Sequence, residues 1–398
     1  MYQVVIVMDI SRRMKKFFII TAVLFGVLLL FFLIYNFLFR NNPLDGKVPN
    51  VAVIPNEPSA SPPKQSDAMK DQKIAPLTDG EGIVPFFDAK DRAVFYLAPD
   101  EKALKETFLA TGLPKTVVNF PFIPKDIVWS PDGGKALVKK NDTEWALFVR
   151  QNEGGSGESM VSLLKPGIES PTWTSLGDRI VYKYFDATTK KRTLNIANPD
   201  GSDWGMIGET PFQFLEMRPV PKSSMVAVWN RGNAFERTSL KALPIVGGDM
   251  REIFSANYGA DYLFAPNGTR ILVSNSIEKG SSSISLALLN DQGGEYTNLF
   301  VPSLVGKAVW SKNSRFVYYA LPGSIPAGSI LPNDYYRKPI LTMDTFWKVD
   351  VETGEKSRVV DPNDIDQSYD AENLVLDADE TMLFFHNRHD GKIYRINL

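Results

Sequence analysis

Four charged residues recur at multiples of about 45 residues along the chain and are the first candidates for chemistry. They are Asp126, Glu216, Asp261 and Lys307, and the equivalent positions elsewhere hold Val84, Ser170 and Asn373. Three carboxylates and one lysine that converge could bind a cation or a polar ligand, because a hard cation needs several oxygen ligands. The same carboxylates could serve as acid and base in an enzyme. The plainer alternative is a channel lined with hydrated polar groups.

A second candidate group, Tyr335, Tyr336 and Arg337, lies in a long segment between two expected strands, Leu321 to Asp344. Long insertions on a regular scaffold often carry function, and Tyr and Arg are residue types that anchor interfaces. We therefore predict that these three residues contact a ligand or partner. The alternative is that the aromatic rings pack the insertion onto its own strands.

Acidic and histidine residues near the C-terminus are weaker candidates. Residues 361–380 contain eight acids and no Lys or Arg, namely Asp361, Asp364, Asp366, Asp370, Glu372, Asp377, Asp379 and Glu380. The stretch lacks the Gly and terminal Glu of an EF-hand loop, so we interpret it as a hydrated acidic loop. His386 and His389 have only Asp390 as a nearby third ligand. We therefore predict no metal and no cofactor.

The composition excludes several classes of protein. The 398 residues include no Cys and only two His, which excludes disulfides, thiolate metal sites and cysteine nucleophiles. With 46 acidic and 44 basic residues the net charge is -2, so we expect no nucleic-acid partner. The chain contains no G-x-S-x-G motif, and no Gly-rich phosphate loop precedes a predicted helix. We assign no catalytic residue.

Repeated strand-turn-strand segments must position these candidates. The copies read FFDAKDRAVFY, VWSPDGGKALV, TWTSLGDRIVY, RPVPKSSMVAV, LFAPNGTRILV, VWSKNSRFVYY and VLDADETMLFF. Measured at Phe87, Trp129, Trp173, Pro219, Phe264, Trp310 and Leu376, the intervals are 42, 44, 46, 45, 46 and 66 residues. Most copies are followed by a second hairpin with a Gly-bearing turn. Four strands per repeat, seven times, predict an all-β, seven-bladed β-propeller over residues 74–398.

Strand connectivity predicts where the candidates meet. Because the strands of a blade alternate in direction, the start of each first strand and each second-to-third loop lie on one face, here called the top face. The charged positions and the insertion should therefore converge there. We also predict that KIAPLT, Lys73 to Thr78, pairs with the C-terminal KIYRINL to complete the last blade.

The N-terminal part predicts a membrane anchor. Phe17 to Phe39 is an uncharged run of 23 residues, long enough to span a bilayer. It is longer than the apolar region of a cleavable signal peptide, the main alternative, so we interpret it as an uncleaved signal anchor. Four basic residues precede it closely, so the positive-inside rule predicts a cytoplasmic tail, residues 1–16, and an extracytoplasmic remainder. Residues 41–73, with six prolines, should form a disordered, semi-extended linker.

The segment WSPDGGKALV at residues 129–138, with its relatives, resembles the WD-like repeat of TolB-type propellers, in which a Trp-Ser-Pro-Asp-Gly turn joins the inner strands of each blade. The resemblance covers residues 74–398, although Pro219 and Leu376 replace Trp in two copies. It implies a binding platform. We therefore expect a single-pass protein of the cell membrane that presents a non-catalytic platform for an envelope protein, peptide or glycan. The alternative is a channel-mouth lyase or hydrolase acting on a cell-wall or small-molecule substrate.

Overall fold

The computed structural model describes residues 72–151, 159–337 and 340–398. The chain divides into two compact units, Met1–Pro62 and Pro63–Leu398, and all described residues belong to the second. The predicted cytoplasmic tail, the membrane helix and nearly all of the linker therefore lie outside the described residues. Within the described ranges, no helix is long and apolar enough to cross a membrane.

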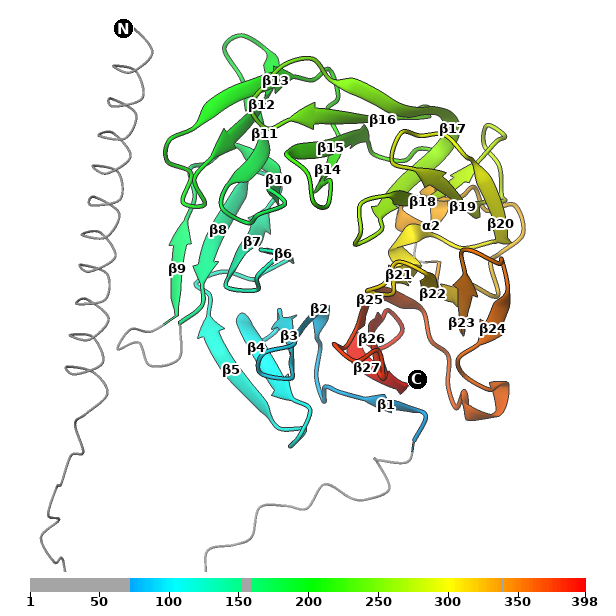
Figure 1. Ribbon diagram of the computed structural model, residues 1–398. Helices are drawn as coiled ribbons and strands as arrows, with labels where there is room; N and C mark the ends of the chain where they lie inside the picture. The colour runs from blue at the N-terminus through cyan, green and yellow to red at the C-terminus, as the bar shows by residue number, and fades with distance from the viewer. Residues whose placement is uncertain (1–71, 152–158, 338–339) are drawn as a thin grey trace, which may run out of the picture. The chain divides into compact units, whose positions relative to one another are not determined.

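The described strands pair with their neighbours in the chain to form six antiparallel sheets (Figure 1). The first three sheets have four strands each. They consist of β2 (Ile83–Asp88), β3 (Ala93–Ala98), β4 (Ala103–Phe108) and β5 (Pro114–Asn119); β6 (Asp126–Trp129), β7 (Lys135–Asn141), β8 (Glu144–Val149) and β9 (Met160–Leu163); and β10 (Ile168–Trp173), β11 (Ile180–Asp186), β12 (Lys191–Ala197) and β13 (Gly205–Glu209).

The fourth sheet has seven strands and the last two have four. They consist of β14 (Leu215–Pro219), β15 (Met225–Asn230), β16 (Arg237–Pro244), β17 (Arg251–Phe264), β18 (Arg270–Ser276), β19 (Ser285–Asn290) and β20 (Thr297–Val301); β21 (Ala308–Trp310), β22 (Phe316–Leu321), β23 (Thr345–Asp350) and β24 (Lys356–Arg358); and β25 (Ala371–Leu376), β26 (Met382–Asn387) and β27 (Lys392–Asn397) with β1 (Ile74–Pro76). One short α-helix, α2 (Asn333–Arg337), and two 3₁₀ turns, Val305–Lys307 and Pro362–Asp364, are the helical elements among the described residues. The all-β class is confirmed.

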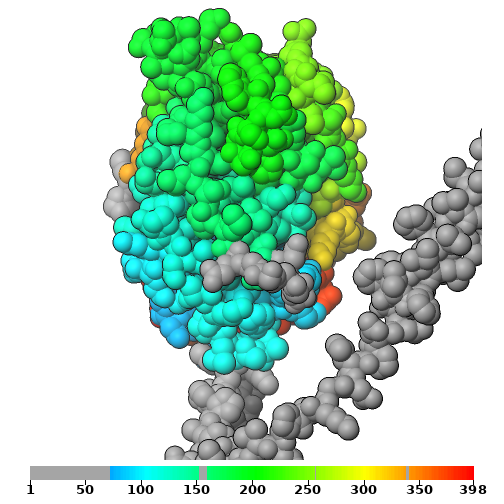
Figure 2. Space-filling view, turned by 90° about the vertical axis from the view of Figure 1, so that its left-hand side faces the viewer, coloured from blue at the N-terminus to red at the C-terminus, as the bar shows by residue number. Residues whose placement is uncertain are grey.

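The sheets surround a common axis with their first strands innermost (Figure 1). The last strands of the first three sheets, β5, β9 and β13, form the flank seen in Figure 2; β5 and β9 are largely exposed and β13 is partly exposed. The hydrophobic core lies between neighbouring sheets, as where Phe95 of β3 and Phe148 of β8 share one buried cluster with Ile127. Burial between sheets positions each innermost strand.

The repeated turns owe their sequence to backbone hydrogen bonding. Ser130 Oγ accepts a hydrogen bond from the Lys135 backbone N at 2.9 Å and donates one to Asp132 at 2.6 Å, while Gly133 supplies a φ of +68°. The tryptophan position of the repeat connects neighbouring sheets instead. Trp173 Nε1 donates a hydrogen bond to the Val128 carbonyl oxygen of the preceding sheet at 2.8 Å. Trp310 makes the same contact with Leu263 at 3.1 Å. The repeat motif thus closes a turn and ties adjacent sheets.

Two features of the sheets bear on the sequence predictions. The pairing of the segment before the first repeat with the C-terminal strand is confirmed, because Ile74 pairs with Ile396 and Pro76 with Tyr394. The fourth and fifth repeats are not separate sheets. Strand β17 pairs with β16 through its first half and with β18 through its second half, so it belongs to both repeats. This continuous strand places Asp261 directly beside the first of these two repeats.

Candidate functional site

A cavity of about 870 Å³ lies where the start of β14, the β15–β16 loop, β17 and helix α2 meet. We call it the channel-mouth cavity. Four of the seven predicted contact residues line it, namely Glu216, Asp261, Tyr336 and Arg337. Asp126, Lys307 and Tyr335 are not among its lining residues. The predicted convergence of charged strand positions and insertion therefore holds for four residues.

Glu216 carries an ion pair at the cavity wall. Its Oε1 accepts a hydrogen bond from Nε of Arg231 at 2.8 Å. The Arg231 guanidinium carbon lies 5.8 Å from the centre of the Phe214 ring, within the range of a cation–π contact. The Arg231 side chain remains 62% exposed, and the Phe214 residue 60%. Sequence reasoning missed both residues; the only local signal was Arg231 directly after a predicted strand.

Asp261 lies deeper in the same cavity. Its Oδ1 accepts hydrogen bonds from Trp229 Nε1 at 3.1 Å and from the Tyr262 backbone N at 3.0 Å. Burial, helped by the negative charge of Glu216, raises the pKa of Asp261 to about 6. This carboxyl group therefore titrates close to neutral pH, as a general acid or base must.

Asp126, on β6, is near this pair but outside the cavity lining. Its Oδ1 accepts a hydrogen bond from the Ile127 backbone N at 2.8 Å. Burial raises its pKa, the positive charges of Arg218 and Lys139 oppose that change, and the charge of Glu216 adds to it. Asp126 thus interacts electrostatically with Glu216 but does not line the cavity.

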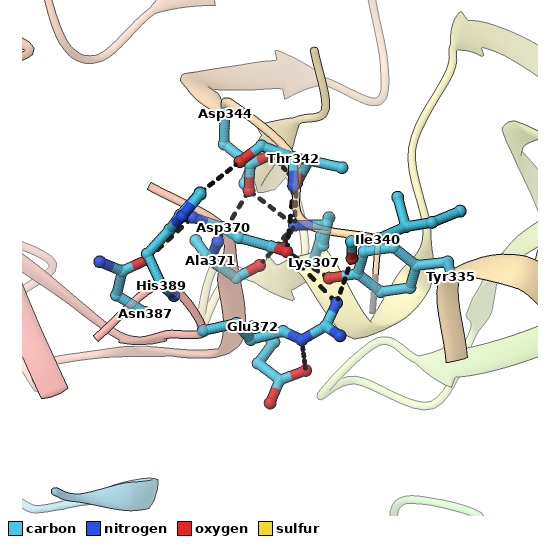
Figure 3. Close-up of polar contacts among 12 residues, drawn as sticks. Lys307, Tyr335, Ile340, Thr342, Asp344, Asp370, Ala371, Glu372, Asn387 and His389 are labelled. Atoms are coloured by element: carbon cyan, nitrogen blue, oxygen red, sulfur yellow. Dashed lines mark hydrogen bonds and ion pairs between the residues drawn. The ribbon is translucent and has the colours of Figure 1, made fainter. Parts of the chain in front are cut away.

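Lys307 belongs to a second polar cluster, which we call the buried network: Lys307, Tyr335, Thr342, Asp344, Asp370 and Arg388 (Figure 3). Lys307 Nζ lies 2.6 Å from Asp344 Oδ2 and 2.6 Å from Asp370 Oδ1. It also donates to Thr342 Oγ1 at 3.2 Å and to the Ala371 carbonyl oxygen at 3.0 Å. With 1% of the Lys307 side chain exposed, the ammonium group is fully enclosed.

Tyr335 and Arg388 complete the buried network around Asp370. The Tyr335 hydroxyl donates to Asp370 Oδ1 at 2.7 Å (Figure 3). Arg388 lies 3.2 Å from Asp370 Oδ2, with its guanidinium 4.5 Å from the Tyr335 ring centre. Although burial opposes ionisation, Lys307 and its hydrogen bonds lower the pKa of Asp370. The hydrated-loop interpretation is wrong for Asp370 and also for Asp377, whose side chains are 0% exposed in both cases. Asp377 accepts turn hydrogen bonds from Thr381 and Met382.

The insertion links the cavity to the buried network. Asn333 Oδ1 accepts a hydrogen bond from the Ala234 backbone N at 2.9 Å, and its Nδ2 donates to Asn233 at 3.1 Å. The Leu331 backbone N donates to the Ser281 carbonyl oxygen at 3.1 Å. The insertion therefore crosses the loops of the seven-stranded sheet before it reaches Asp344.

Helix α2 separates the two adjacent tyrosines of the insertion. Successive residues of an α-helix point about 100° apart, so neighbours face different surroundings. Tyr335 is 3% exposed and packs with Leu304 and Leu331, whereas Tyr336 is 55% exposed and lines the cavity. Tyr335 therefore packs the insertion onto the scaffold, as the alternative interpretation had it. Tyr336 lines the cavity, and its contact with a ligand stays a prediction.

The histidines have partners of their own. His386 Nδ1 lies 3.0 Å from Glu372 Oε1, and His389 Nε2 lies 2.9 Å from the Thr342 carbonyl oxygen. In the part of the chain that the structure describes, no three Asp, Glu or His side chains are grouped so that they could hold a metal ion.

Comparisons with known proteins show the fold. No protein-family model matches the sequence. No curated protein matches it significantly. Among solved structures, oligogalacturonate lyase from Vibrio parahaemolyticus matches with a TM-score of 0.62 at 11% identity, over 83% of this chain and 94% of that chain. The Cps50 (Swd1) β-propeller domain of Myceliophteria thermophila matches with a TM-score of 0.54 at 9% identity, over 82% and 99% of the two chains.

TolB from Acinetobacter baumannii is also similar, with a TM-score of 0.44 at 13% identity over 77% of this chain and 63% of that chain. The propeller fold that the repeats predicted is confirmed by the likeness to the Cps50 (Swd1) β-propeller domain. At these identities the likeness extends to fold alone.

Proposed function

We propose that the chain is a seven-bladed β-propeller that acts as a non-catalytic binding platform, with the channel-mouth cavity as its contact surface. Seven blades follow if the seven-stranded sheet counts as two that share β17. The observation that carries the function is the cavity itself: about 870 Å³, at the junction of four separate segments, with Tyr336 and Phe214 exposed at its wall. Exposed aromatic rings beside polar groups are the composition of a recognition surface.

The membrane anchor belongs to the same proposal. Phe17 to Phe39 would hold the chain in the cell membrane, with the propeller outside the cytoplasm on the proline-rich linker. An envelope protein, peptide or glycan would then bind at the top face. Lys307 and Tyr335 keep a scaffold role here, because their enclosure in the buried network gives a ligand no access.

One observation favours a second candidate, a channel-mouth lyase or hydrolase. Burial and the charge of Glu216 raise the pKa of Asp261 to about 6, so one carboxyl group that titrates close to neutral pH lies in the same cavity as a second carboxyl group, the ion-paired Glu216. The similar fold of an oligogalacturonate lyase is compatible with such chemistry, without assigning it to this chain. In that case Asp261 and Glu216 would be acid and base.

Capture from solubilised membranes separates the two candidates. The bait is the full-length protein, compared with Tyr336→Ala and Arg337→Ala, which change exposed side chains and leave the buried network intact. Leu176→Ala is the matched control, because Leu176 is 83% exposed at the β10–β11 turn, at the other end of the innermost strands. We expect one envelope component that wild type and control retain and that both cavity variants lose.

The platform proposal fails if all four baits recover the same components. The enzyme candidate gains instead if the protein turns over a pectic or cell-wall oligosaccharide and Asp261→Asn and Glu216→Gln abolish that turnover. A platform should show no turnover for either variant to remove.

A further inference from the structure

Arg231 shows what kind of group the channel-mouth cavity holds. Its guanidinium makes a cation–π contact with the Phe214 ring, and its Nε donates a hydrogen bond to Glu216. The cavity wall therefore binds one cationic group through an aromatic ring and a carboxylate. These contacts hold the Arg231 side chain weakly. The guanidinium has five N–H donors, and the bond from Nε to Glu216 is the only hydrogen bond that it makes to a described residue. A side chain that is 62% exposed can leave this position without unfolding the chain.

The other charged groups at the cavity wall are mostly carboxylates, which can accept hydrogen bonds from a cationic ligand. Asp261 accepts both of its hydrogen bonds from described residues on Oδ1, which leaves Oδ2 for another donor. Glu236, exposed at the rim, is a further carboxylate. Arg337 is the only basic residue besides Arg231 among the described lining residues.

Electrostatic effects at the cavity wall agree with this inventory. The surrounding protein removes part of the hydration of the Tyr336 hydroxyl and raises its pKa, and the charges of Asp261, Glu372 and Glu216 raise it further, against a smaller opposite effect of Arg388. Burial and the charge of Glu216 raise the pKa of Asp261, and the positive charge of Arg218 lowers it by a smaller amount. Negative charge therefore dominates where the Tyr336 hydroxyl and the Asp261 carboxyl lie.

We infer that the channel-mouth cavity binds the basic side chain of a peptide segment, Arg or Lys, and that Arg231 occupies the same place when no ligand is bound. This inference rests on the proposed platform function and names its ligand. The ligand's cationic group would lie between the carboxylates of Glu216 and Asp261, with its aliphatic stem against the exposed rings of Phe214 and Tyr336. Binding requires the Arg231 side chain to swing out.

Titration calorimetry with short peptides tests the charge requirement. The full-length protein in mild detergent at 150 mM salt is titrated with acetyl-Ala-Arg-Ala-amide, its Lys analogue and its citrulline analogue. Citrulline has nearly the shape of arginine without the charge. We expect the Arg and Lys peptides to bind at least about tenfold more tightly than the citrulline peptide, because ion pairs and cation–π contacts both need the charge.

Two variants test the role of Arg231. Arg231→Gln removes the internal occupant and should tighten the Arg peptide's binding by about three- to tenfold, whereas Glu216→Gln should weaken it by about tenfold. Arg192→Gln is the matched control, because Arg192 lies 4.8 Å from the Phe185 ring outside the cavity. It should leave the affinity unchanged. Thermal unfolding of each variant confirms that the fold is retained.

Three results would overturn the inference: citrulline binding as well as arginine, Arg231→Gln weakening the Arg peptide, or spermidine binding more tightly than either peptide. Failure here is distinguishable from failure of the platform proposal. If Tyr336→Ala abolishes capture of an envelope component while no basic peptide binds, the platform stands and its ligand is not basic. If neither measurement shows binding, both fail.

Discussion

The buried network and the channel-mouth cavity are built from the same kinds of residue, but the charged side chains are enclosed in the first and reach solvent in the second. Each combines carboxylates with cationic side chains and a tyrosine from α2, Tyr335 in one and Tyr336 in the other. In the buried network the Lys307, Asp344 and Asp370 side chains are at most 1% exposed and bonded to one another. In the cavity the Arg231 side chain is 62% exposed. Burial, rather than residue type, separates the buried network from the cavity wall.

The energetic consequence differs between the two regions. Removing one partner of a buried ion pair leaves an uncompensated charge where water cannot reach it, at a cost of several kcal/mol. An exposed ion pair such as Glu216 with Arg231 contributes little to stability, because water solvates either partner alone. The buried network therefore fixes the insertion, whereas the Arg231 side chain can leave Glu216 at little cost in stability.

Replacing Lys307, the buried cation, should have the largest effect on the free energy of unfolding and so gives the strongest test of this comparison. Lys307→Met keeps the apolar stem but leaves the buried Asp344 without a counter-ion and Asp370 with Arg388 alone, so we expect the free energy of unfolding to fall by about 3–5 kcal/mol. Denaturant unfolding of the full-length protein, followed by tryptophan fluorescence, measures it. Lys191→Met, at a surface pair with Glu209, is the control and should cost less than about 1 kcal/mol. Equal losses would show that the buried network is not structural.

Neutralising Asp261, a carboxyl group of the cavity, should increase the stability of the protein, by an amount that depends on pH. Because the folded-state pKa of Asp261 is raised to about 6 from 3.8, the folded state binds the proton more tightly, and stability is lost as pH rises between these values. Asp261→Asn cannot ionise, and its Oδ1 can still accept from Trp229. We expect it to stabilise the protein at pH 8 by up to about 3 kcal/mol and by almost nothing at pH 4. A gain independent of pH would contradict the raised pKa.

Removing one hydroxyl from each tyrosine sharpens the comparison with the smallest change. Tyr335→Phe deprives Asp370 of a buried donor and should lower the free energy of unfolding by about 1–2 kcal/mol. Tyr336→Phe should change it by less than about 0.5 kcal/mol, because half of that side chain is in solvent. Urea unfolding of the pair side by side is the measurement. Equal effects would mean that α2 does not divide the two environments.

Features governed by neighbouring residues in the chain were predictable. The turn at Ser130, with Asp132 and Gly133, satisfies its own backbone hydrogen bonds within six residues. The local sequence was therefore enough to predict it. The pairing of β1 with β27 followed from counting strands per repeat. The fusion of two repeats through β17 was not predictable, because the segment around Gly259 could as well form a turn as a kinked strand, and Gly259 indeed has a φ of +61°.

The sequence by itself determined the strands, the turns and the residue types at the channel mouth, because alternation and turn chemistry act over a few residues. Only the tertiary structure decided which of those residues are enclosed. Lys307 meets Asp344 and Asp370 across 37 and 63 residues of chain, and the enclosure that makes it part of the scaffold comes from the insertion and the last sheet together. Charge burial depends on which distant segments meet, and no local pattern records that.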